Sequence, residues 1–93
     1  MRERTIEAYL RDEVKKAGGL ALKWVSPGNA GVPDRIVITP GGRIVFVELK
    51  APGRKPTALQ QYQLDRLRAL GCDVRVIDSR EGVDTLIREL TGG

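Results

Sequence analysis

The architecture of this chain follows from the stretch GVPDRIVITPGGRIVFVELK, residues 31–50. Two short runs rich in Ile and Val flank Pro-Gly-Gly, which is the pattern of a β-hairpin. The same hairpin carries an acid at Asp34, a second acid at Glu48 and a lysine at Lys50. These charges need a chemical reason, because a charged group buried among apolar strands is costly unless it is paired or binds a metal.

The length of the turn determines whether the two acids share a face of the hairpin. A two-residue loop would shift the pairing by one residue and put Asp34 and Glu48 on opposite faces. We favour a three-residue loop over residues 40–42, because Pro suits the first position of a type I turn and Gly42 suits the left-handed position after it. Asp34 then lies directly opposite Glu48, with Lys50 on the same face.

The remaining elements follow from hydrophobic spacing and from turn residues. Apolar residues at helical spacing predict a first helix that ends at Gly18-Gly19, and residues 20–25 predict a strand before a loop over residues 26–33. Thr57 begins a second helix, residues 73–77 form a strand, and Ser79 caps a last helix. The order is α-β-β-β-α-β-α within one domain, residues 1–93. Because a helical crossover leads to the last strand, this strand should run parallel to residues 43–50, in a mixed α/β sheet flanked by helices.

Composition narrows the chemistry. The chain has 93 residues, no His, a net charge of +4 and eleven Arg against five Lys. A metal site without His uses oxygen ligands, which favours Mg²⁺ or Mn²⁺, and an Arg-rich basic chain favours nucleic acid as its partner. A single Cys, no membrane-length apolar run and no signal peptide lead us to expect a cytoplasmic protein without membrane partners.

Two opposed carboxylates, about 4.5–5.5 Å apart at their Cβ atoms, repel each other unless one takes up a proton or a cation lies between them. A divalent cation would remove this conflict. The alternative is that both acids are solvated at strand ends or paired with Lys50. The predicted register favours the cation.

Pro33-Asp34 followed by Glu48-Leu49-Lys50 resembles the PD-(D/E)xK nuclease superfamily. The run GVPDRIV…GRIVFVELKAPG, with TALQQYQLDRLRALG after it, resembles the VRR-Nuc branch of that superfamily. The resemblance covers nearly the whole chain and implies a restriction-endonuclease-like α-β-β-β-α-β core. The family often has Pro where this chain has Ala58, which leaves the site residues unchanged.

The resemblance implies that Asp34 and Glu48 ligate Mg²⁺ or Mn²⁺, with the Leu49 carbonyl as a third protein ligand. It also implies that Glu7 and Gln60 complete the site. Periodicity alone makes Glu7 a solvated residue beside the apolar stripe. Capping-box spacing makes Gln60 a partner of the helix N-terminus.

We expect Lys50 to stay protonated between two carboxylates, to position the attacking water and to stabilise phosphorane charge; a general-base role is the alternative. We expect Trp24 and Tyr62 to be packing residues, with base stacking as the alternative. The candidate DNA contacts are Lys23, Ser26, Asn29, Arg35, Arg54 and Lys55.

Together these features predict a metal-dependent DNA endonuclease of replication, repair or recombination. The resemblance implies that a small member of this family acts, as a homodimer, on branched DNA such as four-way (Holliday) junctions. The protein should need no small-molecule cofactor and should act in a bacterial or phage-infected cell. The alternatives are a less selective nickase or end-trimming nuclease, a non-catalytic nucleic-acid-binding module, and a structural subunit of a phage or repair complex. A homodimer is expected because the core is small and a junction offers two equivalent strands; residues 20–25 and the two later helices are the candidate surfaces.

Overall fold

The structure is a computed structural model that describes residues 1–92. Its elements follow the predicted order: α1 (Glu3–Lys16), β1 (Leu20–Lys23), β2 (Arg35–Thr39), β3 (Arg43–Leu49), α2 (Ala58–Ala69), β4 (Val74–Ile77) and α3 (Arg80–Thr91). Strand β1 ends earlier than expected, although the Trp24 amide still donates to the Asp34 carbonyl, 3.0 Å away.

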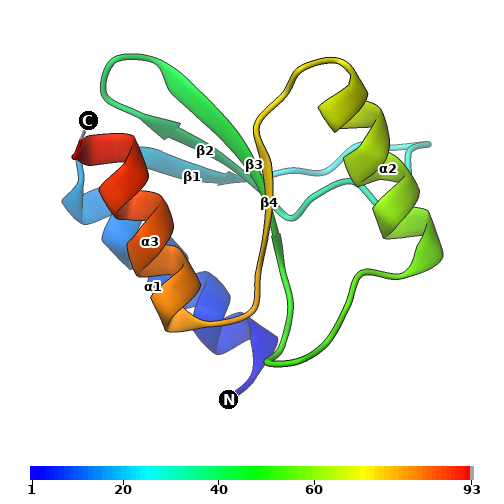
Figure 1. Cartoon of the computed structure of the whole chain (residues 1–93), viewed down its shortest axis with the longest axis horizontal. Coiled ribbons are helices and arrows are strands. Elements are labelled where there is room, and N and C mark those ends of the chain that lie inside the picture. The colour runs from blue at the N-terminus through cyan, green and yellow to red at the C-terminus, as the bar shows by residue number, and fades with distance from the viewer. Residues whose placement is uncertain (93) are drawn as a thin grey trace.

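The four strands form one mixed sheet in the order β1-β2-β3-β4. The first three strands are antiparallel, and β4 runs parallel to β3 as predicted from the helical crossover. Helices α1 and α3 lie side by side against one face of the sheet, and α2 stands apart on the other side (Figure 1). The α/β class and the mixed sheet flanked by helices are therefore confirmed.

The hairpin turn has the predicted length but a different type. Thr39 pairs with Arg43, so residues 40–42 form a three-residue loop. The Gly42 amide donates to the Thr39 carbonyl over 3.0 Å, and both Gly41 and Gly42 have positive φ, 92° and 78°. Positive φ at Gly41 belongs to a type II turn rather than the expected type I turn. The register is unchanged, because it depends on the number of loop residues.

The main core lies between the sheet and the pair α1 and α3. Alternate residues of the hairpin, Val37, Val45, Val47 and Leu49, point to this side and are buried. They meet one stripe from each helix, at the helical spacing that the sequence predicts: Ile6, Leu10 and Val14 from α1, and Val83, Leu86 and Leu90 from α3.

The opposite face of the sheet is only partly covered, because α2 meets the sheet mainly along β4. Leu20 and Ile44 lie in one cross-strand row through Ile38 and are 57% and 51% exposed. Trp24 packs as predicted, with its ring centroid 5.1 Å from that of Phe46. The same prediction is wrong for Tyr62.

Tyr62 is 58% exposed on α2. The Arg66 guanidinium lies over its ring, 5.5 Å from the centroid. The ring therefore contributes to the helix surface and not to the core.

Each open edge of the sheet has an outward carbonyl covered by an arginine. Arg35 Nη1 donates to the Ala21 carbonyl of β1 over 3.1 Å, and Arg68 Nη2 donates to the Val74 carbonyl of β4 over 3.2 Å. These contacts reduce the unpaired backbone that an edge strand offers to another chain. Within residues 1–92, no helix combines the length and apolar character needed to cross a membrane.

Leu10→Ala should lower the free energy of unfolding by about 2–5 kcal/mol, because it opens a cavity at a fully buried position. Leu70→Ala is the matched control, since Leu70 is 81% exposed and its loss should change stability by about 0.5 kcal/mol or less. Urea unfolding of the two variants measures both values. Equal losses would contradict the packing of α1 on the sheet.

Candidate active site

The hairpin register brings the two predicted acids together. Arg35 pairs with Val47, and the next pair in the same register is Asp34 with Glu48. Side chains of directly opposed residues point to the same face. The Leu49 amide donates to Asp34 Oδ2 over 2.8 Å and holds that carboxylate against β3. The prediction that the two acids are cross-strand neighbours is therefore confirmed.

Glu48 is the most unusual side chain in the molecule. It is 1% exposed, and neither of its carboxylate oxygens has a hydrogen-bond partner. The Lys50 ammonium lies 3.5 Å from Glu48 Oε2, a loose ion pair that confirms a shared face for these two residues. The Lys50 amide donates to the Ile77 carbonyl over 2.9 Å, which anchors this position to the end of β4.

The pKa of Glu48 is raised to about 7, from an ordinary value of 4.5. Burial is the largest cause and the neighbouring Asp34 charge adds to it, while the Lys50 ammonium opposes both effects. Without another cation, this carboxyl therefore holds a proton well above the pH at which an exposed glutamate loses it.

This donor set fits a hard divalent cation. Two buried oxygens without partners stand opposite a second carboxylate, and a cation would satisfy both acids at once. Among residues 1–92, no three His, Cys, Asp or Glu side chains form a metal-ligand cluster. Two carboxylates are the protein contribution expected for Mg²⁺, which keeps several waters and takes substrate phosphate oxygens as further ligands.

Glu7 and Arg35 lie away from this pair and engage each other. Glu7 Oε2 accepts a hydrogen bond from Arg35 Nε over 2.8 Å, and the second contact of Arg35 is the Ala21 carbonyl. Arg35 is only 9% exposed. The guanidinium thus links β2 to α1 and β1, and its expected role in phosphate binding stays a prediction that neither of these contacts supports. Glu7 neutralises this buried cation, and its implied site role has no contact in the structure to support it.

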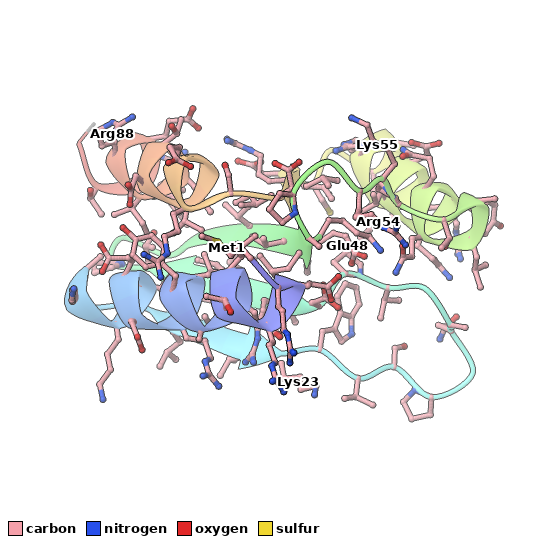
Figure 2. The ribbon with its side chains drawn as sticks, turned by 90° about the horizontal axis from the view of Figure 1, so that it is seen from below. Met1, Lys23, Glu48, Arg54, Lys55 and Arg88 are labelled. Carbon is pink, nitrogen blue, oxygen red and sulfur yellow. The ribbon has the colours of Figure 1, made fainter. Side chains whose placement is uncertain are left out.

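Glu3, one helical turn before Glu7, is the acid that sequence analysis missed. It lines a hollow of about 600 Å³ together with Lys50, Arg54 and Lys55, and its charge helps to raise the pKa of Glu48. Met1, which precedes α1 in the chain, lies near Glu48 in Figure 2. Helical periodicity defines the buried stripe of α1 but not which flanking acid faces the end of β3. The position of Glu3 in the first turn is the available signal.

Gln60 forms the capping box that its spacing predicts. The Thr57 amide donates to Gln60 Oε1 over 2.9 Å, and the Gln60 amide donates to Thr57 Oγ1 over 3.2 Å. These bonds begin α2 beside the large hollow, which Thr57 also lines. The structure thus gives Gln60 a structural role, and its implied part in the site stays a prediction.

The loop after β3 holds two of the predicted DNA contacts in a defined turn. The Arg54 amide donates to the Ala51 carbonyl over 3.0 Å, and the Gly53 amide donates to Asp78 Oδ2 over 3.1 Å. Arg54 and Lys55 lie on one side of Glu48 and Lys23 on the other (Figure 2).

Ser26 and Asn29, the remaining predicted contacts, lie in the loop between β1 and β2. The Asn29 amide donates to the Ser26 carbonyl over 3.0 Å, and Asn29 Nδ2 donates to Ser26 Oγ over 3.1 Å. These two residues therefore brace each other and lie apart from the loop that carries Arg54 and Lys55.

The metal-free protein should lose stability as the pH rises from about 4.5 to about 7. In this range folded Glu48 keeps a proton that the unfolded chain has released, so the contribution is complete below 4.5 and is lost as the pH passes 7. Urea unfolding in chelator should show this fall, by a few kcal/mol at most, relative to Glu48→Gln. Equal pH dependence in both proteins would contradict the raised pKa.

Comparisons with known proteins agree with this geometry. The chain is 56% identical over 81 residues to the "Putative nuclease p44" of Acyrthosiphon pisum secondary endosymbiont phage 1, covering 87% of each protein. It is also similar to the solved structure of a "VRR_NUC domain", with a TM-score of 0.86 and 37% identity over 92% of this chain and 94% of that one. No family model matches the chain.

Proposed function

The chain belongs to the VRR-Nuc family of nucleases, and from this premise we propose that it is an Mg²⁺- or Mn²⁺-dependent DNA endonuclease specific for branched DNA. The observation that carries the proposal is Glu48, a buried carboxylate without hydrogen-bond partners opposite a second carboxylate. A non-catalytic DNA-binding module has no use for such a pair, because it repels phosphate. The phage origin of the relative supports a role in the DNA metabolism of infected bacteria.

Asp34 and Glu48 are the proposed metal ligands, with the Leu49 carbonyl as a third. When bound there, the cation would supply the Lewis-acid polarisation of the scissile phosphate. The chain prepares this site in advance, because the Leu49 amide fixes the Asp34 carboxylate and the sheet buries Glu48. Such preorganisation lowers the cost of reaching the transition state.

Lys50 supplies positive charge at the mouth of the site. Its side chain is 13% exposed and lies beside both the Glu48 carboxylate and the large hollow. We assign its ammonium two tasks, to hold the attacking water and to stabilise the charge that develops on the phosphate oxygens. Glu3, which lines the same hollow, is a candidate to order water near that phosphate.

The substrate backbone is proposed to cross the site between two basic borders. Arg54 and Lys55 form one border, in a loop that Asp78 ties to the end of β4, and Lys23 forms the other (Figure 2). Phosphate contacts of this kind set the position of DNA without reading its sequence. They suit a nuclease that selects DNA by shape.

Asp34→Asn, Glu48→Gln and Lys50→Ala should each reduce cleavage by about 100-fold or more, because each removes a charge from the reacting phosphate or its cation. Labelled linear, flap and four-way-junction DNAs, incubated with Mg²⁺, with Mn²⁺ and with chelator, measure this loss. Chelator should abolish cleavage by the wild-type protein.

Arg88→Ala is the matched control, since Arg88 is exposed on α3 at the far end of the molecule from Glu48 (Figure 2). It should cut at the wild-type rate. All variants should still bind DNA in chelator, and the two acid variants should bind at least as tightly as wild type. Cleavage by Lys50→Ala at the wild-type rate would refute its assigned role.

We further propose that two copies act together on a junction, which presents two equivalent strands to a two-fold dimer. The partly bare face of the sheet supports this, because Leu20 and Ile44 continue one apolar row across Ile38. The arginine-covered edges favour pairing through this face rather than through the strand edges.

Light scattering at micromolar concentration should give twice the 10.2 kDa mass of the chain. Ile44→Lys should yield a monomer, because it places a charge in the apolar row. Thr85→Lys, on the exposed surface of α3, is the control and should remain a dimer. A monomeric wild-type protein that cuts linear duplex as fast as junctions would instead support the less selective nickase.

A further inference from the structure

Another, smaller hollow lies between α2 and the loop that joins β1 to β2. Its volume is about 180 Å³, less than a drug-sized pocket, which commonly exceeds about 300 Å³. Aliphatic and aromatic side chains form its walls, and polar groups surround them. The residues used in the argument below are Trp24, Asn29, Val32, Gln63, Arg66 and Leu70.

Trp24 connects this hollow to the proposed metal site. Its amide donates to the Asp34 carbonyl, so Trp24 extends the cross-strand row that contains Asp34 and Glu48. Side chains in one row point to the same face of a sheet. Two strand spacings separate Trp24 from Glu48, a distance of about 10 Å. A nucleotide next to the scissile phosphate would reach the hollow.

The hollow is formed before any ligand arrives. The Trp24 ring packs on Phe46, and Gln63 Nε2 donates to the Ala30 carbonyl over 3.0 Å, which ties the loop to α2. Gly31 lies against Leu59 with φ of 87°, where an added Cβ would come within 3.0 Å of the Leu59 side chain. This close approach keeps the loop against the helix, so a ligand would not need to organise it.

The chemistry of the walls suits one planar ring with polar edges. Trp24 is half-buried and offers an aromatic surface, while Val32 and Leu70 provide apolar contact. Asn29 carries an amide whose Oδ1 can accept from a base edge, while its Nδ2 donates to Ser26 Oγ. Arg66 donates to Gln63 Oε1 over 3.3 Å through Nη1, and its other N–H groups can serve a neighbouring phosphate. Aromatic platforms beside basic groups are the usual way in which proteins bind unpaired bases.

We propose that this hollow binds the base of one unpaired nucleotide adjacent to the cleaved phosphate. The proposal rests on the proposed nuclease function and extends it, because a perfect duplex has no free base to place there. Branch points and strand ends release such bases at low cost. Base capture at Trp24 thus gives a physical reason for a preference for branched DNA.

Trp24 is the only Trp in the chain, so its fluorescence reports on the hollow directly. In chelator, to prevent cleavage, a junction with one unpaired nucleotide at its branch point should quench this fluorescence. The same junction with an abasic site at that nucleotide should bind without quenching. This comparison uses the wild-type protein and does not depend on the folding of a variant.

Affinity for the unpaired-base junction, measured by anisotropy of labelled DNA, provides a second test. Trp24→Leu should weaken binding by about tenfold, and Trp24→Phe should restore most of the loss, because stacking needs only an aromatic ring. Arg88→Ala, at the far end of the molecule from Glu48, is the control and should leave affinity unchanged (Figure 2). None of these variants should change the affinity for the abasic junction.

Equal quenching of Trp24 by the junction with an unpaired nucleotide and by the abasic junction would overturn the proposal. A change in Trp24 fluorescence that depends on protein concentration in the absence of DNA would also overturn it, because the hollow would then bind a second copy of the chain. Base-dependent quenching by a protein that cuts none of the DNAs with Mg²⁺ or Mn²⁺ would support the base site and count against the nuclease function alone.

Discussion

The number of residues in the turn at Pro40–Gly42 controls the whole arrangement. Three residues place Asp34 opposite Glu48 and direct Val45 and Val47 into the core. A shift of one residue would reverse every side chain of one strand. The hydrophobic core and the pair of acids therefore depend on the same register, and neither can change without the other.

The two faces of the sheet have different roles: one packs the core, and the other carries the candidate active site. The face toward α1 and α3 holds the packed core, whereas the face toward α2 carries the acids, Lys50 and an incomplete apolar surface. One hollow lies between α2 and the loop that joins β1 to β2, and the larger hollow lies where the start of α1 meets the loop after β3. A chain with one modest core can thus keep enough open surface for a substrate.

Sequence alone predicted the features that depend on local patterns: the order of elements, the loop length, the acid pair and the caps of α2 and α3. Prediction from sequence failed where tertiary contacts decide which of several similar residues is buried or faces the site. Glu3 and Glu7 lie one turn apart on α1, and only the position of Arg35 shows which of them is engaged inside. Exposed Tyr62 could not be distinguished from a core aromatic, because the aromatic ring suits either place and the helix does not show how much of it the sheet covers.

The buried Glu48 carboxyl has a consequence for the evolution of such domains. A buried acid without hydrogen-bond partners weakens the folded chain, and an apolar residue of similar size would fill the same space at lower cost. Selection on folding alone therefore removes this acid as soon as catalysis ceases to matter. Arg54 and Lys55 are exposed and nearly neutral for stability, so they would persist far longer. In a lineage that has lost the cleavage activity, Glu48 should therefore be substituted first. The basic surface would then remain around an inactive site.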